Sequence, residues 1–291
     1  MTARRVLVTG AGGYVGKAVM NALTRSGWMT CPTARQPGTV NGLAVVPADL
    51  SREDDVRRLL ATTAPTAVIH CAARIRGASH EFLRDNVEAT SLLARLSAEM
   101  GVARLIHCST TTIYAGGGPF DEAAPLAPAE PYGWSKLASE AAIRAVADRL
   151  PIVILRLSGV HGPDRRSGLV SACLDAIEQG ILPRVTEPET VLRPLFRDDA
   201  AQACRRALDM DMPERDSVQT YNIAGADSLS LRELAQRIGA AFGKTWDIPT
   251  DPKAERRNRD VHIDAARHGL GYEPRPLETH LAEMSMSRGW A

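Results

Sequence analysis

Short apolar runs alternate with longer amphipathic segments over the first 155 residues of the chain. The apolar runs predict strands at residues 5–9, 28–33, 43–46, 67–70, 105–108 and 152–157. The segments between them repeat apolar residues at helical spacing and predict helices at residues 13–26, 53–61, 82–100 and 132–149. Strands that are apolar on both faces and alternate with helices are typical of a buried parallel sheet. The pattern therefore predicts an α/β fold, a doubly wound parallel sheet with helices on both faces.

The pattern loosens after about residue 158, where glycine and proline punctuate the chain. Three further elements are predicted there: a helix at 199–208, a strand at 220–224 and a helix at 230–242. We expect one domain over residues 1–157, to which a segment at about 195–224 returns. Residues 158–194 and 225–291 are expected to form a smaller C-terminal α/β lobe.

The composition disfavours several classes of function. The formal net charge is +1 and aromatic residues make up 4% of the chain, so no nucleic-acid partner is expected. No apolar run is long enough for a membrane span or a signal peptide, and the expected location is the cytoplasm. The 7 histidines lack metal-ligand spacing, so no metal is expected. The 5 cysteines have no CxxC spacing and are expected to be reduced, with a catalytic Cys108 as the less favoured alternative.

A glycine-rich loop, Thr9-Gly10-Ala11-Gly12-Gly13-Tyr14-Val15-Gly16, joins the first predicted strand to the first predicted helix. Gly10 allows a tight turn, Gly13 lets the backbone approach a pyrophosphate, and Gly16 lets the helix and strand pack closely. Free N–H groups and a partial positive charge at the helix N-terminus suit the same anion. The loop therefore predicts a dinucleotide-binding Rossmann domain, which leaves substrate binding to the smaller lobe.

Asp49 follows the third predicted strand, at the sheet edge where such domains bind ligands. It is expected to accept a hydrogen bond from the adenine amino group. The alternative is an aspartate that only shapes the turn before Ser51. Ser51 itself is expected to cap the helix at 53–61, because Asp54 stands three residues further on.

The end of the second predicted strand bears on the choice of cofactor. An acid at this place holds a ribose 2′-hydroxyl, whereas a cation accommodates a 2′-phosphate. The chain reads Thr33-Ala34-Arg35 here, with no acid. NADP is therefore favoured over NAD, with a solvated Arg35 as the alternative interpretation.

Tyr132 and Lys136 stand four residues apart at the start of a predicted helix, in Pro131-Tyr132-Gly133-Trp134-Ser135-Lys136. This spacing places both side chains on one face of the helix, about 6 Å apart along its axis. A lysine ammonium beside a phenol favours the phenolate, which makes the tyrosine a usable proton shuttle. The same spacing also occurs in helices as a solvated pair, but here it follows a phosphate loop and a polar strand end.

The motifs together resemble the extended short-chain dehydrogenases/reductases, and more narrowly the NAD(P)-dependent epimerase/dehydratase family of nucleotide-sugar enzymes. The resemblance rests on TGAGGYVG at 9–16, DL at 49–50, VIHCAA at 68–73, STTTIY at 109–114, PYGWSKLASE at 131–140, LRLSGVHGP at 155–163, RPLFRDDAA at 193–201, YNIAGADSLSLRELA at 221–235 and RNRD at 257–260. It therefore spans nearly the whole chain. It implies the family's fold and chemistry, and it leaves the substrate open.

The resemblance implies roles for the matching residues. Tyr132 is the general acid or base, Lys136 tunes it and binds the ribose, and Thr110 is the hydroxyl that holds the reacting oxygen, with Ser109 as its fallback. The expected cofactor-binding residues are Gly10, Gly13, Tyr14, Val15, Gly16, Arg35, Asp49, Leu50, Cys71, Ala72, Ala73, Tyr132 and Lys136. Arg193 and Arg257 resemble the arginines that hold a substrate diphosphate, although both are alternatively surface charges. A homodimer through the helices at 82–100 and 132–149 is expected from the resemblance alone.

The chain also departs from the family's pattern. Gly159 stands where asparagine is usual, His161 where tyrosine is usual and Ala115 where glycine is usual. A dehydratase of this family usually carries Asp-Glu after its catalytic threonine, as the acid and base that remove water. Thr111 and Thr112 occupy those places here, which argues against dehydration.

The expected reaction is hydride transfer between a nicotinamide and a carbinol or ketone carbon of a nucleotide-activated sugar. An epimerase that keeps its NAD and a 4-ketoreductase that consumes NADPH stay equally open. A reductase of a small non-sugar ketone or aldehyde is a further alternative. A cofactor-sensing regulator without chemistry is disfavoured, because it has no need of Tyr132 and Lys136.

Overall fold

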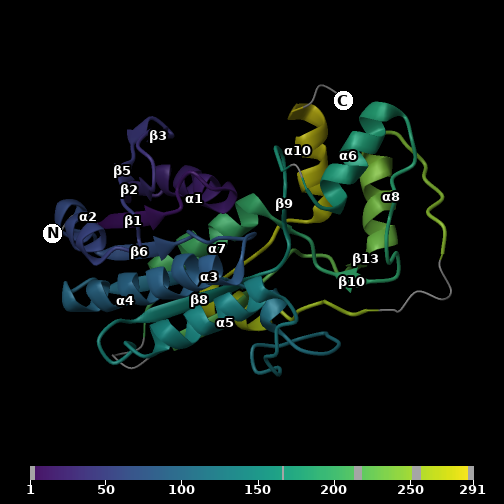
Figure 1. Ribbon diagram of the computed structural model, residues 1–291. Helices are drawn as coiled ribbons and strands as arrows, with labels where there is room; N and C mark the ends of the chain where they lie inside the picture. Colours follow the sequence, from purple (N-terminus) through teal and green to yellow (C-terminus); the bar gives the residue numbers. More distant parts are fainter. Residues whose placement is uncertain (1–3, 166, 213–217, 251–256, 288–291) are drawn as a thin grey trace.

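Seven parallel strands form the central sheet of the computed structural model, which describes residues 4–165, 167–212, 218–250 and 257–287 (Figure 1). In spatial order the strands are β12 (Val218–Ile223), β8 (Ile152–Leu157), β7 (Arg104–Thr110), β6 (Ala67–His70), β1 (Arg5–Thr9), β2 (Met29–Ala34) and β5 (Val46–Pro47). Each neighbouring pair in this sheet is parallel. The chain moves outward in both directions from β1, and open sheets of this kind bind ligands where that order reverses.

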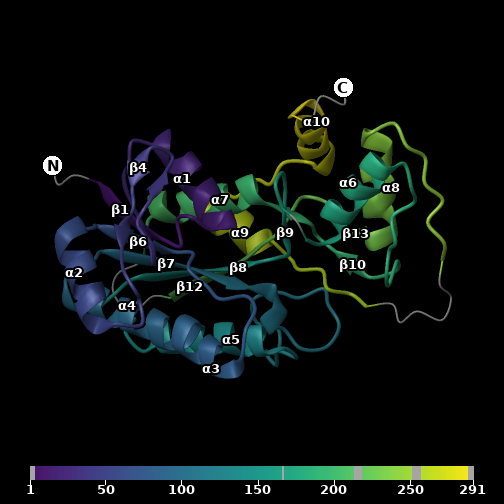
Figure 2. The same cartoon turned by 45° about the horizontal axis from the view of Figure 1, so that its top comes forward.

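Helices cover both faces of the sheet, because alternate strand residues face opposite ways. Val6 and Val8 belong to one buried cluster and Leu7 to the other. The helices of the first face are α1 (Tyr14–Thr24), α7 (Arg197–Asp209) and α9 (Asp264–Leu270), and those of the second are α2 (Glu53–Thr63), α4 (Ala89–Glu99) and α5 (Pro131–Arg144). Figure 2 shows the two layers above and below the strands. The predicted doubly wound parallel sheet is confirmed.

A smaller lobe stands beside the sheet with a hydrophobic core of its own (Figure 1). Its helices are α6 (Leu169–Gln179), α8 (Leu231–Ala241) and α10 (Leu277–Ser287). Its short strands β10 (Val191–Leu192) and β13 (Leu229–Ser230) pair antiparallel. A parallel pair, β9 (Val160–His161) and β11 (Leu195–Phe196), follows the last residues of β8 and leads into α7. β12 then returns to the edge of the main sheet, beside β8.

The structure differs from the sequence-based expectations in detail. The strand expected at 43–46 is divided between β4 (Leu43–Ala44), which forms a hairpin with β3 (Thr39–Val40), and β5. The helix expected at 82–100 begins earlier and consists of α3 (Ser79–Phe82), a π-helical segment η1 (Leu83–Glu88) and α4. The predicted Ser51 cap is wrong: α2 has Arg52 at its N-cap position with no side-chain cap, and Ser51 bonds to Asp49 instead.

Candidate active site

The glycine-rich loop is packed too tightly for any larger residue at two of its positions. Gly10 has a φ of +63°, and a Cβ there would lie 2.7 Å from the Ala72 Cα. A Cβ on Gly16 would lie 2.1 Å from the Gly10 carbonyl oxygen. Gly13 begins α1 without a side-chain cap, so the first N–H groups of that helix carry no side-chain acceptor. This backbone cradle fits a pyrophosphate, as the sequence predicts.

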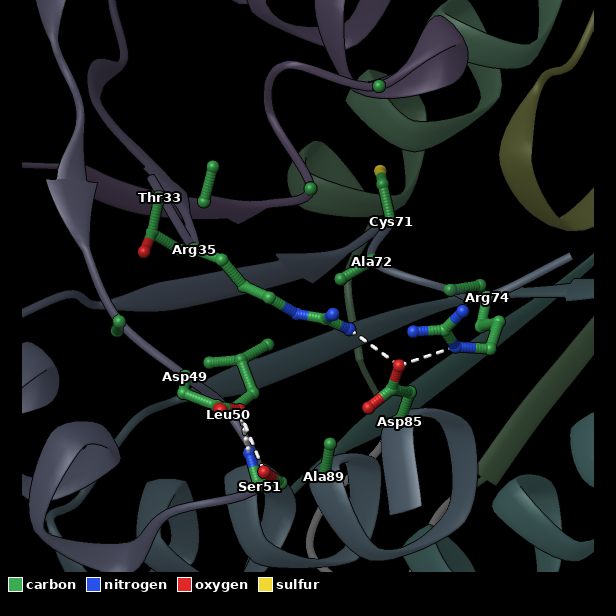
Figure 3. A pocket seen from close by; sticks show the side chains of 15 residues that line it. Thr33, Arg35, Asp49, Leu50, Ser51, Cys71, Ala72, Arg74, Asp85 and Ala89 are labelled. Atoms are coloured by element: carbon green, nitrogen blue, oxygen red, sulfur yellow. Dashed lines mark hydrogen bonds and ion pairs between the residues drawn. The ribbon is translucent and has the colours of Figure 1, made fainter. Parts of the chain in front are cut away.

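A cavity of about 210 Å³ opens beside this loop, at the ends of β1, β2 and β6 (Figure 3). Its walls are made by Gly10, Gly13, Thr33, Ala34, Arg35, Ala48, Asp49, Leu50, Ser51, Cys71, Ala72, Ala73, Arg74, Asp85 and Ala89. Eight of these lining residues were expected from the sequence to touch the cofactor: Gly10, Gly13, Arg35, Asp49, Leu50, Cys71, Ala72 and Ala73. The segments that follow β1, β2, β5 and β6 thus converge on one pocket next to the phosphate loop, and it suits the adenosine half of a dinucleotide.

Two arginines share one carboxylate inside this pocket. Figure 3 shows Arg35 reaching across the cavity to Asp85, and Arg74 meeting the same carboxylate from the other side. The distances to Asp85 Oδ2 are 2.7 Å from Arg35 Nη2 and 2.6 Å from Arg74 Nε, and Arg84 binds the second oxygen. Burial disfavours the charged form of Asp85, but these hydrogen bonds outweigh it and hold its pKa well below the usual range. Asp85 and Arg74 were not predicted from the sequence.

Asp49 stabilises the turn before α2 and also lines the pocket. Its Oδ1 accepts hydrogen bonds from the Ser51 N–H at 3.0 Å and from the Ser51 hydroxyl at 2.7 Å. Burial raises the pKa of Asp49, but these two hydrogen bonds lower it further than burial raises it. The contact with Ser51 is the turn-shaping alternative, and it leaves Asp49 on the pocket wall.

A second glycine contact brings the start of α5 against the end of β7. A Cβ on Gly133 would lie 2.9 Å from the Thr112 carbonyl oxygen, so only glycine allows this approach. Tyr132 therefore lies in the first turn of α5, next to the residue that packs on the turn after β7. The buried Thr110 caps the 3₁₀ turn η2 (Thr111–Ile113), accepting the Thr112 N–H at 3.2 Å. The backbone thus packs the residue after the predicted phenol against the turn that follows the predicted hydroxyl.

Lys136 is fully buried one turn along α5 from Tyr132, with 1% of its surface exposed. Its Nζ lies 3.1 Å from Nε2 of His107, a histidine of β7 that is buried as well. Burial lowers the pKa of Lys136 to about 8, with the negative charges of Cys108 and Glu140 opposing it. His107 was not singled out from the sequence.

The expectation that Lys136 lowers the pKa of Tyr132 is not met in the protein alone. Burial raises the pKa of Tyr132 to about 12, the negative charge of Cys108 raises it further, and Arg165 lowers it. The lysine bonds to His107 instead. The phenol is therefore protonated near neutral pH.

Ser109, the fallback hydroxyl, is directed elsewhere. Its Oγ donates to Glu140 Oε1 at 2.5 Å, and Arg156 binds both oxygens of the same carboxylate at 3.2 and 2.9 Å. Successive strand residues point to opposite faces, so the Thr110 side chain points away from this network. Ser109 belongs to a buried ionic network, and the catalytic role of Thr110 stays a prediction.

The two candidate substrate arginines are both paired with acids. Arg193 Nε lies 2.9 Å from Asp260 Oδ1, and one fifth of its side chain is exposed. Arg257 Nη1 lies 3.4 Å from Glu187 Oε1, with nearly half of its side chain exposed. Neither arginine lines the pocket beside the glycine-rich loop. Both belong to the segments around β10.

The described part of the chain contains no group of three or more His, Cys, Asp and Glu side chains that could hold a metal ion. Within the same residues, no helix has the length and apolar character that crossing a membrane requires.

A parallel sheet with a glycine cradle, an adjoining pocket and a Tyr-Lys helix defines a dinucleotide-binding protein of the short-chain type. The model of the NAD dependent epimerase/dehydratase family matches residues 6–224, and the chain belongs to this family. The resemblance inferred from the motifs is thereby confirmed.

The individual relatives share less than a third of their residues with this chain. The chain is 28% identical to dTDP-glucose 4,6-dehydratase of Neisseria meningitidis, an alignment that covers 99% of this chain and 93% of the relative. Among solved structures, a putative epimerase from Burkholderia cenocepacia has a TM-score of 0.86 at 24% identity, with 99% of both chains covered. The Bordetella bronchiseptica enzyme WbmG, in complex with NAD and UDP, has a TM-score of 0.81 at 20% identity, with 99% of this chain and 95% of that chain covered. Identities at this level establish the shared fold.

Proposed function

We propose that this protein is an NAD(P)-dependent oxidoreductase or epimerase that acts on a carbinol or ketone carbon of a nucleotide-activated sugar. The observation that carries the proposal is the packing of Gly133, the residue after Tyr132, against Thr112 in the turn that follows Thr110. Bound NAD(P) supplies or accepts the hydride.

The chain's own residues do the rest. Thr110 hydrogen-bonds the reacting oxygen, and Tyr132 gives or takes its proton. Lys136 is hydrogen-bonded to His107, and its proposed role is to bind the ribose hydroxyls of the cofactor. Because the pKa of Tyr132 is about 12, the phenol is protonated and suited to donate its proton during ketone reduction.

Dehydration is disfavoured, although the relatives include dTDP-glucose 4,6-dehydratases. Eliminating water from a sugar needs an acid and a base beside the carbon chain. Thr111 and Thr112, which form the turn after Thr110, carry no ionisable group. This leaves epimerisation or simple reduction as the chemistry that these residues suit.

The cofactor pocket favours NADP and hence a reductase over an epimerase. Arg35 lines the pocket, and no acid stands at the end of β2. Its partner Asp85 holds the guanidinium inside the pocket, near the place where a 2′-phosphate is expected. The presence of NAD in the WbmG complex supports a dinucleotide as the cofactor and leaves the choice between NAD and NADP to experiment.

We further propose that the smaller lobe holds the sugar nucleotide, with Arg193 and Arg257 exchanging their acid partners for its diphosphate. UDP in the WbmG complex supports this class of substrate. A homodimer through α5 and η1 is proposed as well, because Trp134 and Leu83 on these helices are more than half exposed. Sedimentation of the purified protein tests the dimer.

Replacing the phenol tests the reaction directly. Tyr132→Phe is expected to reduce turnover by about 10²- to 10⁴-fold, the usual contribution of a positioned acid or base, while NADP still raises the thermal stability of the variant. Turnover is followed as NADPH oxidation with 4-keto sugar nucleotides, and as product formation by enzyme with bound NAD. Tyr221→Phe, in β12, is the matched control and is expected to keep full activity. Undiminished turnover of Tyr132→Phe with every substrate that the wild type accepts would refute the assignment.

A further inference from the structure

Three cysteine thiols meet on one face of the sheet, beneath the cofactor pocket. Cys71 Sγ lies 3.6 Å from Cys108 Sγ, and Cys108 Sγ lies 3.7 Å from Cys204 Sγ. Cys71 follows β6, Cys108 lies in β7, and Cys204 lies in α7, which packs against β7. The other two cysteines, Cys31 and Cys173, belong to different hydrophobic cores.

The register of the sheet places two of these thiols side by side. β6 and β7 are parallel neighbours in which His70 pairs with His107, so the next residues are Cys71 and Cys108. Neighbouring strands are roughly 4.7–4.9 Å apart, which falls in the range of about 4.4–6.8 Å that a disulfide allows between Cα atoms. The sulfur atoms need to approach from 3.6 Å to roughly 2.05 Å to form the bond.

The environment favours a thiolate on Cys108. Hydrogen bonds from the thiols of Cys204 and Cys71 hold the pKa of Cys108 well below its ordinary value, against the effect of burial. The nearby Lys136 ammonium lowers this pKa as well. The pKa of Cys71 is raised because its thiol donates to the Cys108 sulfur. One sulfur of the pair is thus the nucleophile, and the other keeps its proton.

An access route leads from solvent to this pair. Cys71 is partly exposed and forms part of the cofactor pocket wall, where Figure 3 shows its sulfur atom. Cys108 lies behind it with 8% of its surface exposed. A small oxidant that enters the pocket therefore reaches the pair, and a dinucleotide that fills the pocket covers it.

We propose that Cys71 and Cys108 are an oxidative modification site in the cofactor pocket, at which a hydroperoxide converts the two thiols into a disulfide. The Cys108 thiolate attacks a peroxide oxygen, the O–O bond breaks, and an alcohol or water leaves with a proton. Cys108 is then a sulfenic acid. The Cys71 sulfur attacks it, loses its proton and displaces water, so the two thiols give up the two electrons that reduce the peroxide.

The disulfide ties the pocket wall to the strand that carries the catalytic hydroxyl. Cys71 precedes Ala72, whose Cα already lies against Gly10 of the phosphate loop. Cys108 stands two residues before Thr110. Oxidation is therefore expected to lower cofactor affinity and turnover, and reduction by dithiothreitol is expected to restore both. This functional consequence rests on the proposed function, whereas the disulfide itself does not.

Trypsin separates the three cysteines of the cluster, which makes the site directly testable. Cys71 falls in the fragment 59–74, Cys108 in 105–136 and Cys204 in 198–205. Full-length protein is reduced, desalted, treated with hydrogen peroxide, alkylated and digested without reductant. Mass spectrometry is expected to find 59–74 linked to 105–136. Linkage of 105–136 to 198–205, or the absence of any linked fragment, overturns the proposal.

Variants and cofactor give independent readouts. Cys71→Ala is expected to lose the cross-link and to accumulate sulfinic acid at Cys108, which dithiothreitol does not reverse. Cys108→Ala is expected to lower the rate of peroxide-dependent thiol loss by about tenfold, because the remaining thiols are protonated. Cys31→Ser is the matched control and is expected to form the cross-link at the wild-type rate. An unchanged rate of thiol loss in Cys108→Ala speaks against the site.

The cofactor arm separates the two proposals. Saturating NADP, shown to be bound by thermal shift, is expected to slow formation of the disulfide. Formation at an equal rate with NADP bound overturns the proposed route through the pocket. If NADP and NAD both fail to bind while the disulfide still forms, the proposed function fails and the modification site stands.

Discussion

The contact between Lys136 and His107 predicts a specific change in the pH dependence of catalysis. Lys136 is charged, 1% exposed, and hydrogen-bonded through Nζ to Nε2 of a histidine that is itself fully buried. His107→Leu places an apolar side chain of similar size in β7 and removes the Nε2 acceptor. His107→Gln keeps an acceptor and is the matched control.

The size of the effect follows from the hydrogen bond. A hydrogen bond to a charged group contributes about 1.5–3 kcal/mol, and about 1.36 kcal/mol corresponds to one pKa unit. The bond favours the ammonium, so its loss lowers the pKa of Lys136, by about 1–2 units. Starting from about 8, the lysine of His107→Leu is half or more deprotonated at pH 7, whereas that of the wild type is mostly charged.

The assay is the pH profile of kcat/KM for the hydride-transfer reaction. Catalysis needs the charged lysine, so activity falls as the pH rises through its pKa. The alkaline limb of the profile is expected to move to lower pH by about 1–2 units in His107→Leu, and to stay near its wild-type position in His107→Gln. A merely structural role lowers activity at every pH without moving the limb. Superimposable limbs for His107→Leu and the wild type would refute the reasoning.

Three further predictions concern stability and cofactor choice. Glu140→Ala leaves the buried Arg156 without its carboxylate and is expected to lower the free energy of unfolding by about 3–5 kcal/mol in urea titrations; a loss below 1 kcal/mol contradicts this. Burial lowers the pKa of His70 to about 3, so the unfolded chain binds the proton first, and stability is lost as the pH falls from about 6.5. For His70 alone the loss is about 2 kcal/mol between pH 6.5 and 5, and equal unfolding free energies at both values would exclude it. Arg35→Ala is expected to raise KM for NADP by about tenfold and to leave KM for NAD unchanged; an equal effect on both cofactors would assign Arg35 to holding Asp85 alone.

The inner strands of the main sheet were predictable because they are buried on both faces. Runs such as Ala67–His70 are apolar enough to stand out from their amphipathic neighbours. The existence of a smaller lobe was predicted, but only some of its helices and strands were. β9, β10, β11 and β13 are two residues long, too short for any periodicity, and they depend on contacts between distant segments. α6 (Leu169–Gln179) lies in the stretch after residue 158 that glycine and proline punctuate, and no helix was predicted there.

Some residues that line the cofactor pocket were predictable and others were not. Asp49, Leu50 and Cys71 were found because they follow strands, and ligands gather at those ends. Asp85 lies within the π-helical segment η1, where a carboxylate reads as an ordinary solvated charge. Its approach to Arg35 depends on how η1 packs against the sheet. Local sequence carries no signal for that contact.

His107 and the Cys71–Cys108 pair could have been found from the sequence by comparing two strands. Residues 69–71 and 106–108 both read Ile-His-Cys. Parallel strands in register put identical positions side by side, and alternation sends the histidines to one face and the cysteines to the other. The histidines accordingly meet Thr90 of α4 and Lys136 of α5, while Cys108 meets Cys204 of α7. A shift of one residue in the register would exchange the faces and remove both contacts, so the support of Lys136 and the thiol pair depend on the same alignment of β6 with β7.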